Sequence, residues 1–342
     1  MASEKLVYKV DDRSILLPFY RRWLVDPLLP LIPARVNPNT ITHAGHLSNL
    51  TGTVLLIALW PDRGWSLIAA MVLLQIYMWC DNADGSHARR TNQCSPFGEF
   101  LDHGLDQLNT VYIGYLTAMA LGVPPIWWVI IALIIPGAGA VTYWEQSQTG
   151  IFRLGLLNQV ESLTVLSIAL TVSAIFGREF WATTKIFGIS LQNGMLWWTA
   201  STILFGMARA LVRVAQVRGF NAVLPILGLL AFGGAIVLAA KQEAISTIFA
   251  VTLCTGLNVY FGMRMLAHRL HGEEPRVEIV LVIGTAILAL LVGARVAGLA
   301  VSPLVGPAFA VVACGIFALL AIGDTRRSIV HLDAPSYPRA RG

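Results

Sequence analysis

The 342-residue chain is 56% hydrophobic and 13% charged, with a net charge of +5 and a mean hydropathy of +0.67. Soluble domains carry about 25% charged residues, so this composition excludes an ordinary soluble globular protein. The four cysteines are scattered without metal-ligand spacing, which argues against both a disulfide framework and a zinc site. The N-terminus, MASEKLVYKVDDR, is polar without an apolar core and is therefore not a signal peptide.

The first predicted element is Ser14–Pro33, which mixes arginines, Trp23 and many leucines with four prolines. We expect an N-terminal interfacial helix there, because such a segment lies in the membrane surface rather than crossing it. Ten apolar segments follow, and crossing about 30 Å of hydrocarbon takes roughly 20 residues. Their approximate spans are 40–60, 65–88, 96–121, 124–144, 160–177, 196–217, 220–240, 244–264, 277–299 and 304–323. The predicted fold class is all-α, a polytopic integral membrane protein with about ten transmembrane helices.

The basic residues test this layout. If the N-terminus is cytoplasmic, 19 of the 24 lysines and arginines fall on the cytoplasmic side. The opposite side receives only Arg63, Arg178, Lys185, Lys241 and Arg295. This asymmetry follows the positive-inside rule and predicts that both termini are cytoplasmic. Because topology explains the basic charge, we expect no nucleic-acid partner.

A polar cluster interrupts the second and third spans over Cys80–Gln107, CDNADGSHARRTNQCSPFGEFLDHGLDQ. Ionisable groups at membrane helix ends are costly and mark functional sites by default. The alternative is a solvated loop between helices. The spacing argues against a loop, because Asp81, Asp84, Gly85 and Ala88 follow i, i+3, i+4, i+7 and share one helix face.

A second face carries Gly98, Asp102 and Asp106 at i, i+4, i+8. Two such faces opposite each other would bring four carboxylates into one space, where they stay ionised only beside a cation. Hard oxygen ligands favour Mg²⁺ or Mn²⁺. Gly85 would let a phosphate approach the backbone, and Arg89 offers a fork suited to phosphate oxygens. The cluster therefore predicts metal-assisted phosphoryl chemistry at the cytoplasmic membrane face.

The order of these residues also resembles a known family. Residues 81–106 read D-x-x-D-G-x-x-A-R, eight residues, then G-x-x-x-D-x-x-x-D, which is similar to the CDP-alcohol phosphotransferase signature at every fixed position. CDNADGSHARRT and SPFGEFLDHGLD resemble the choline/ethanolamine phosphotransferase branch, as do YWE at 143–145 and TGIFRLG at 149–155. The resemblance is strong over 38–161 and looser beyond. Ser86 and His87 stand where a Lys-Gln pair is more usual, which leaves the alcohol headgroup open.

The resemblance implies a helical membrane enzyme that transfers phosphocholine or phosphoethanolamine from CDP-choline or CDP-ethanolamine to diacylglycerol and releases CMP. It further implies a Mg²⁺ or Mn²⁺ cofactor, expected as two ions, membrane lipid as surroundings, and a homodimer as a common state. One alternative is a phosphatidyltransferase that uses CDP-diacylglycerol with a soluble alcohol. A cation-coupled transporter is another, although transporters place their coupling sites near the bilayer midplane.

The resemblance also assigns roles to single residues. The implied metal ligands are Asp81, Asp84, Asp102 and Asp106. The acceptor alcohol must lose a proton, so a base is expected. Asp106 is the family's usual candidate, and His103 is the other because Glu99, Asp102, His103 and Asp106 recur at helical spacing. In that second case Glu99 would orient His103.

Further residues are expected near the substrate. The candidates for nucleotide or phosphate binding are Asn39, Gly85, Ala88, Arg89 and Gly98. Asn39 has the alternative of capping the helix that begins there. Glu145 and Arg153 are candidate contacts for the headgroup or nucleotide. His87 lies off the aspartate face, so it is either a bystander or a phosphate contact.

The chain has no long linker or low-complexity stretch, which predicts a single membrane domain over residues 1–342. Its expected parts are a cytoplasmic or interfacial segment 1–37, CDP-alcohol-binding catalytic helices 38–161, additional transmembrane helices 162–323 and a cytoplasmic tail 324–342. The site should face the cytoplasm. The compartment would be the endoplasmic reticulum or Golgi in a eukaryote and the inner membrane in a bacterium.

Overall fold

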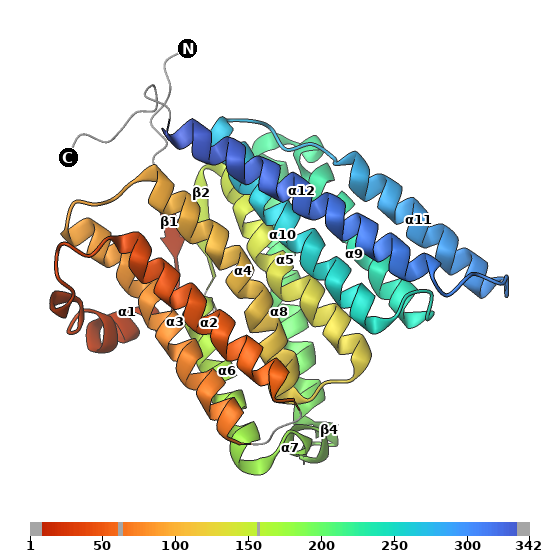
Figure 1. Ribbon diagram of the computed structural model, residues 1–342, viewed down its shortest axis with the longest axis horizontal. Coiled ribbons are helices and arrows are strands. Elements are labelled where there is room, and N and C mark those ends of the chain that lie inside the picture. Colours follow the sequence, from red (N-terminus) through yellow and green to blue (C-terminus); the bar gives the residue numbers. More distant parts are fainter. Residues whose placement is uncertain (1–8, 61–63, 156–157, 334–342) are drawn as a thin grey trace. The chain divides into compact units, whose positions relative to one another are not determined.

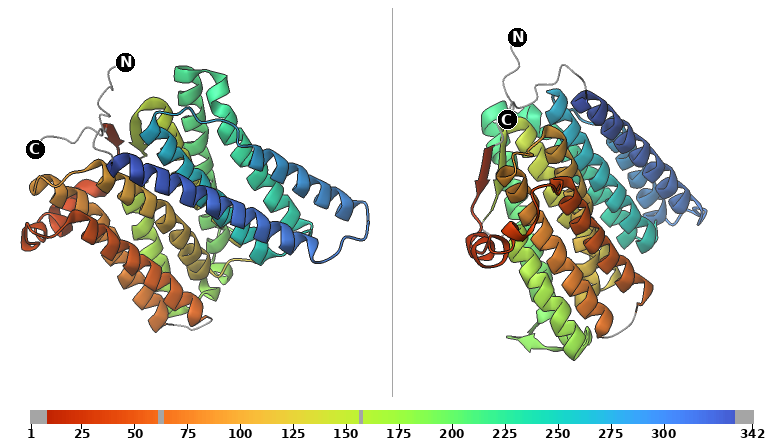
Figure 2. Two further views of the ribbon diagram at one scale, coloured as in Figure 1. Left: turned by 45° about the horizontal axis from the view of Figure 1, so that its top comes forward. Right: turned by 60° about the vertical axis from the view of Figure 1, so that its left-hand side comes forward.

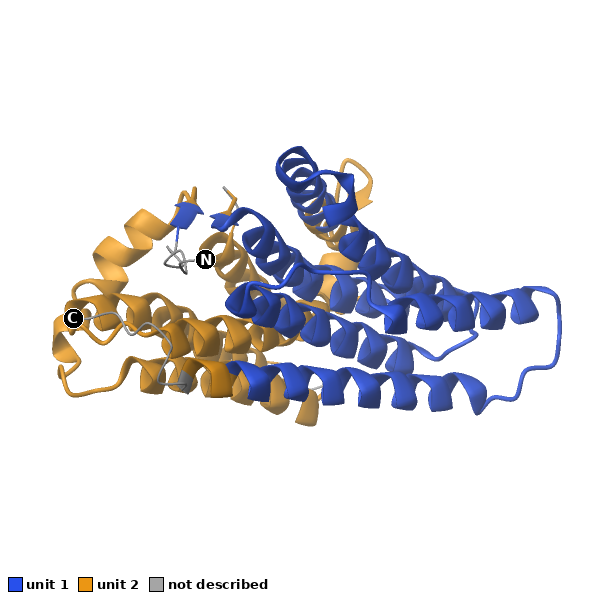
Figure 3. Cartoon of the chain, turned by 90° about the horizontal axis from the view of Figure 1, so that it is seen from above, with its two compact units in different colours: residues 1–11, 124–153, 200–328 blue, residues 12–123, 154–199, 329–342 orange. Residues whose placement is uncertain are grey.

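The computed structural model describes residues 9–60, 64–155 and 158–333, which form parts of two compact units (Figure 3). Unit 1 is drawn from 1–11, 124–153 and 200–328, and unit 2 from 12–123, 154–199 and 329–342. Four of the basic residues counted for topology, Lys5, Arg63, Arg339 and Arg341, lie outside the described residues. The single membrane domain with its four segments stays a prediction.

The described part of the chain contains ten helices of 18 residues or more, at the ten places where spans are predicted (Figure 1). They are α2 Pro38–Ala58, α3 Trp65–Arg90, α4 Pro96–Leu121, α5 Pro125–Thr149, α6 Gln159–Phe176, α8 Leu191–Arg218, α9 Leu224–Lys241, α10 Thr247–His271, α11 Ile279–Val296 and α12 Val305–Asp333. The only strands in that part are the short pieces β1 Lys9–Asp12, β2 Ile151–Leu154, β3 Lys185–Ile186 and β4 Ile189–Ser190. The all-α prediction is therefore confirmed.

Eight helices of the described chain are long and apolar enough to cross a membrane. Helices α2 and α4 have sufficient length but carry many polar residues, including those of the aspartate cluster. Large apolar side chains such as Ile279, Leu290 and Leu319 are more than 70% exposed, as expected for helices that face lipid. The chain is an all-α polytopic integral membrane protein.

Several helices extend past their predicted ends into polar sequence. Helix α5 reaches Thr149 rather than 144, and α10 reaches His271 rather than 264. Each stops at a glycine of positive φ, Gly150 at 71° and Gly272 at 66°, a conformation that ends helices. Helix α12 continues to Asp333, so the first part of the predicted tail is helical.

Helices α2, α3, α4 and α6 form the core of unit 2 (Figure 2). Two glycines allow α2 and α3 to approach closely, as small residues do between membrane helices. A Cβ at Gly45 would lie 2.8 Å from the Cβ of Cys80, and one at Gly52 would lie 3.2 Å from the Cβ of Leu73. This close packing places the polar end of α3 beside α2.

The predicted interfacial segment is a series of short turns in unit 2. They are α1 Leu17–Tyr20, the π-helical η1 Arg21–Val25 and the 3₁₀-helical η2 Leu29–Leu31. Phe19, Trp23 and Leu31 are more than half exposed. Amphipathic segments with exposed aromatic and leucine side chains bind the membrane surface, so this composition fits the interfacial prediction.

Unit 1 contains α5, α9, α10, α11 and most of α8 and α12, with the remaining turns α7 Glu179–Thr183 in unit 2 and η3 Phe220–Val223 in unit 1. Helix α10 packs along α5, where the buried Asn258 amide donates to the carbonyls of Ala132 and Leu133. Polar groups thus join helices within the apolar interior.

Candidate metal and phosphoryl-transfer site

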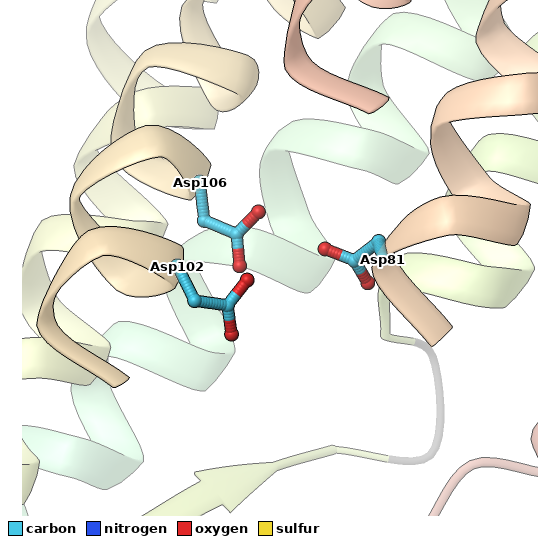
Figure 4. A group of neighbouring side chains, drawn as sticks. All are labelled: Asp81, Asp102 and Asp106. Atoms are coloured by element: carbon cyan, nitrogen blue, oxygen red, sulfur yellow. The ribbon is translucent and has the colours of Figure 1, made fainter. Parts of the chain in front are cut away.

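Three carboxylates meet between two helices of unit 2. Asp81 projects from α3 towards Asp102 and Asp106 on α4, and one oxygen of each lies within 4.8 Å of the others (Figure 4). All three side chains are half-buried. Such close carboxylates repel one another without a compensating cation. The donor set is made of oxygen only, so it fits a hard divalent metal ion.

Asp84 lies outside this group of three. It is 6% exposed, and its carboxylate accepts hydrogen bonds from the Thr42 hydroxyl, at 2.6 Å, and from the Gly85 backbone. Thr42 belongs to α2, so Asp84 ties α3 to the beginning of that helix. The predicted role of Asp84 as a metal ligand stays a prediction.

A tyrosine that sequence analysis missed supports Asp106. The Tyr77 hydroxyl on α3 donates to Oδ1 of Asp106 at 3.1 Å, and Gln159 of α6 donates to Tyr77 at 2.8 Å. Outer partners of this kind orient metal ligands. Tyr77 lies one turn before Asp81 on the same helix face, which is the only signal for it in the sequence.

The candidate base residues lie beside the carboxylates on α4. His103 is 4% exposed, so it is not a surface histidine, and Glu99 is half-buried one turn earlier. Both are outside the group of three carboxylates. The choice between His103 and Asp106 as the base stays open at this point.

The start of α4 lies against the start of α2. A Cβ at Gly98 would be 3.2 Å from Oδ1 of Asn39, so the missing side chain makes room for that amide. The predicted cap was wrong, because the side chain of Asn37, not Asn39, accepts the helix N–H of α2. Asn39 is thereby left facing Gly98, and its role in nucleotide binding stays a prediction.

Two arginines follow the aspartates at the end of α3. Within the described residues, no ion pair joins Arg89 or Arg90 to a motif aspartate, although the positive charge of Arg89 acts on Asp84 at longer range. A Cβ at Gly85 would lie 3.4 Å from Nη1 of Arg89, which places the guanidinium over this glycine. Ala88 is buried, 8% exposed, and its small side chain adds little bulk to that face of α3.

His87 fixes the loop before α2. It is fully buried, its Nε2 lies 2.9 Å from the carbonyl of Val36, and its Nδ1 lies 3.1 Å from Arg90. Arg90 also donates to the carbonyl of Ile32. These contacts give His87 a structural role, which leaves no free nitrogen for a phosphate.

Glu145 and Arg153 belong to unit 1, where they pair with each other. The Glu145 carboxylate is 3% exposed and binds Arg153 at 3.2 Å and Arg213 at 2.5 and 2.7 Å. Arg213, on α8, was missed by sequence analysis because nothing in its apolar surroundings marks it. The pairing neutralises Glu145 and leaves both arginines partly exposed.

An apolar groove of about 410 Å³ runs along α3 and α6 in unit 2. Its walls come from Tyr20, Leu24, Gln75, Met78, Thr164, Ser167, Ile168, Thr171 and Val172. Gln75 donates to Ser167 across it at 2.6 Å. Met78 lies one helical turn before Asp81 in the sequence of α3, and none of the motif aspartates is among the residues that line the groove.

Comparison with known proteins agrees with this geometry. Residues 35–151 match the family described as CDP-alcohol phosphatidyltransferase, and this segment holds all the motif aspartates. The chain contains a CDP-alcohol phosphatidyltransferase domain.

Curated relatives extend the similarity beyond that segment. Cholinephosphotransferase 1 of Homo sapiens is 34% identical over 187 residues, 52% of this chain and 45% of the relative. Cholinephosphotransferase 1 of Danio rerio is 31% identical over 201 residues, which are 56% of this chain and 52% of the relative. Choline/ethanolaminephosphotransferase 2 of Arabidopsis thaliana is 33% identical over 195 residues, which are 53% of this chain and 48% of the relative. The chain spans about half the length of these relatives.

Proposed function

We propose that the protein transfers phosphocholine or phosphoethanolamine from CDP-choline or CDP-ethanolamine to diacylglycerol and releases CMP. The observation that carries the proposal is the group of three carboxylates on α3 and α4, inside the segment that matches the family. The names of the relatives support the choline and ethanolamine donors.

The carboxylates would hold Mg²⁺ or Mn²⁺. Asp81, Asp102 and Asp106 offer three oxygens to one ion, and Asp84 is the remaining carboxylate of the motif for a second. A bound divalent ion neutralises the negative charge of a diphosphate and orients it. Tyr77 holds Asp106 in place for this purpose, since its hydroxyl bonds one carboxylate oxygen.

In the transfer step, the acceptor hydroxyl oxygen forms a bond to the β-phosphorus of the donor. The bond from that phosphorus to the bridging oxygen breaks, and its electron pair leaves with CMP. The hydroxyl proton passes to a base of the enzyme. His103 suits this role because it is buried next to Asp102 in the chain yet outside the group of three carboxylates, and Glu99, one turn earlier on α4, would orient it.

The lipid acceptor would reach the site through the groove along α3 and α6. Diacylglycerol is apolar, and the groove walls are mostly apolar, with Met78 a single turn from Asp81. The polar donor would approach from the water-filled side, where Arg89 is exposed. Separate routes of this kind keep the two substrates apart until they meet at the metal.

The remaining parts of the proposal rest on sequence. The excess of basic residues supports cytoplasmic termini and a cytoplasmic site, in the endoplasmic reticulum, Golgi or inner membrane. Glu145 and Arg153 are proposed contacts for the headgroup or nucleotide, and a homodimer is the proposed assembly. Cysteine-labelling of each loop in sealed vesicles would test the sidedness.

The test of function is a donor and acceptor matrix with purified protein in lipid nanodiscs. We expect CDP-choline or CDP-ethanolamine with diacylglycerol to yield phospholipid and CMP, and Asp81→Asn to yield none. Product formed only from CDP-diacylglycerol and a soluble alcohol would replace the proposal by the phosphatidyltransferase alternative. Cation flux without any transfer would favour a transporter.

A further inference from the structure

Two guanidinium groups meet at a single hydroxyl beside the metal motif. Ser86 accepts a hydrogen bond from Arg21 at 2.6 Å and another from Arg89 at 3.3 Å. Its own proton goes to the carbonyl of Asn82 at 3.2 Å. A hydroxyl has one donor and two acceptor positions, so Ser86 is saturated and holds both arginines in one place.

Neither guanidinium at this point has a carboxylate in direct contact, and Asp84 acts on Arg89 only at longer range. Within residues 9–60, 64–155 and 158–333, no carboxylate forms an ion pair with Arg21 or Arg89. Two cations that share one oxygen repel each other, and an anion between them would relieve the repulsion. Paired guanidinium forks are the preferred protein ligands of phosphate. Arg89 is exposed, so a soluble anion can reach it.

The N-terminal arm, residues 14–25, fixes the position of Arg21. Before Arg21, the hydroxyl of Ser14 and the backbone amides of Ile15 and Leu16 all donate to one oxygen of Glu161, at 2.7 to 2.8 Å. After it, the Leu24 carbonyl accepts from the indole of Trp79 at 2.9 Å. Arg21 begins a π-helical turn, a form frequent at functional sites.

The arm also lies within electrostatic reach of the carboxylates. Burial, and to a smaller extent the charge of Asp81, raise the pKa of Tyr20 to about 12. The guanidinium of Arg89 covers Gly85, the glycine between the metal-site aspartates and Ser86. The Arg89 guanidinium therefore lies over the glycine at which the sequence predicts the close approach of a phosphate.

We infer that Arg21 and Arg89 together bind the phosphate oxygens of a nucleoside diphosphate, so that the N-terminal arm is part of the donor site. The inference rests on the proposed function and adds to it a residue that lies outside the matched segment 35–151. The anion is a nucleotide phosphate rather than a lipid phosphate, since Arg89 faces solvent and Arg21 approaches the aspartate motif.

The test is direct binding of CDP to purified protein in nanodiscs with Mn²⁺, measured by calorimetry. Removing a charge-assisted contact, Arg21→Gln, should weaken CDP binding by about 10–100-fold, while Arg21→Lys recovers part of the loss. Arg22→Gln is the matched control, because the Arg22 guanidinium lies over the Trp23 ring, 5.5 Å from its centroid. That variant should bind CDP like the wild type.

The outcomes separate this inference from the proposed function. If Arg21→Gln melts at the wild-type temperature and binds CDP equally well, Arg21 is structural and the inference is wrong. If Arg21→Gln loses binding to anionic-lipid vesicles while its CDP affinity is unchanged, the site binds a lipid phosphate, and the inference is again wrong. A wild-type protein that binds no CDP at all would instead contradict the proposed function. Should Arg21→Gln fail to fold, Arg21→Lys with unaltered CDP affinity would overturn the inference.

Discussion

The hydroxyl of Tyr77 offers a sharp test of how the carboxylate group is supported. Tyr77→Phe keeps the ring and removes the atom that donates to Asp106 and accepts from Gln159. A hydrogen bond to a charged group contributes about 1.5–3 kcal/mol, and each 1.4 kcal/mol is a factor of ten. Loss of an outer partner typically costs 10–100-fold in metal affinity. We therefore expect Mn²⁺ affinity to fall by about 10–100-fold.

The assay is electron paramagnetic resonance of free Mn²⁺ during titration of purified protein. Tyr112→Phe is the control, because it removes a tyrosine hydroxyl from α4 at a ring that contacts His46 rather than the carboxylates. At saturating Mn²⁺ the turnover of Tyr77→Phe should approach that of the wild type. Equal Mn²⁺ affinities for Tyr77→Phe and the wild type would refute the assigned support of Asp106.

Chelation with EDTA should abolish transfer, and Mg²⁺ or Mn²⁺ should restore it, as radiolabelled product would show. Asp81→Ala or Asp102→Ala should remove both activity and metal-dependent CDP binding in calorimetry, because each deletes one oxygen ligand. His103→Ala should retain CDP binding and lower turnover by about 10²–10⁴-fold, the usual contribution of a base. Gly45→Val should lower the melting temperature in detergent, since its Cβ would lie 2.8 Å from a side-chain carbon of α3 and overpacking costs about 1–3 kcal/mol.

Different results would count against each of these expectations. Full turnover in strong chelator would exclude the metal. If His103→Ala keeps near-normal turnover while Asp106→Asn binds CDP without activity, Asp106 is the base. A Gly45→Val protein as stable as the wild type would show that α2 and α3 can move apart at no measurable cost.

The helices were predictable because the membrane imposes a length and an apolar composition on each of them. The ends of the helices were harder to predict, since α5 and α10 continue through polar residues until a glycine of positive φ ends the helix. The helical spacing also predicted that faces of α3 and α4 would oppose each other, and the oxygens of Asp81, Asp102 and Asp106 do meet.

Contacts between distant segments could not be predicted. Gln159 reaches Tyr77 across 82 residues, and Arg21 reaches Ser86 across 65. No local pattern encodes such pairs, because they depend on how α6 and the N-terminal arm pack against α3. The cap of α2 was misassigned for a smaller reason, since Asn37 and Asn39 both flank Pro38 and only the backbone conformation separates them.

The most direct test of the account follows the phosphorus atom itself. Purified protein would receive CDP-choline labelled with ³²P at the β-phosphate, together with diacylglycerol and Mn²⁺, and the lipid and aqueous phases would be counted. If the protein transfers phosphocholine as proposed, label moves into phosphatidylcholine in step with release of unlabelled CMP, and Asp81→Asn abolishes both. Label that stays in the aqueous phase as phosphocholine while CMP accumulates would show hydrolysis instead of transfer, and it would contradict the account.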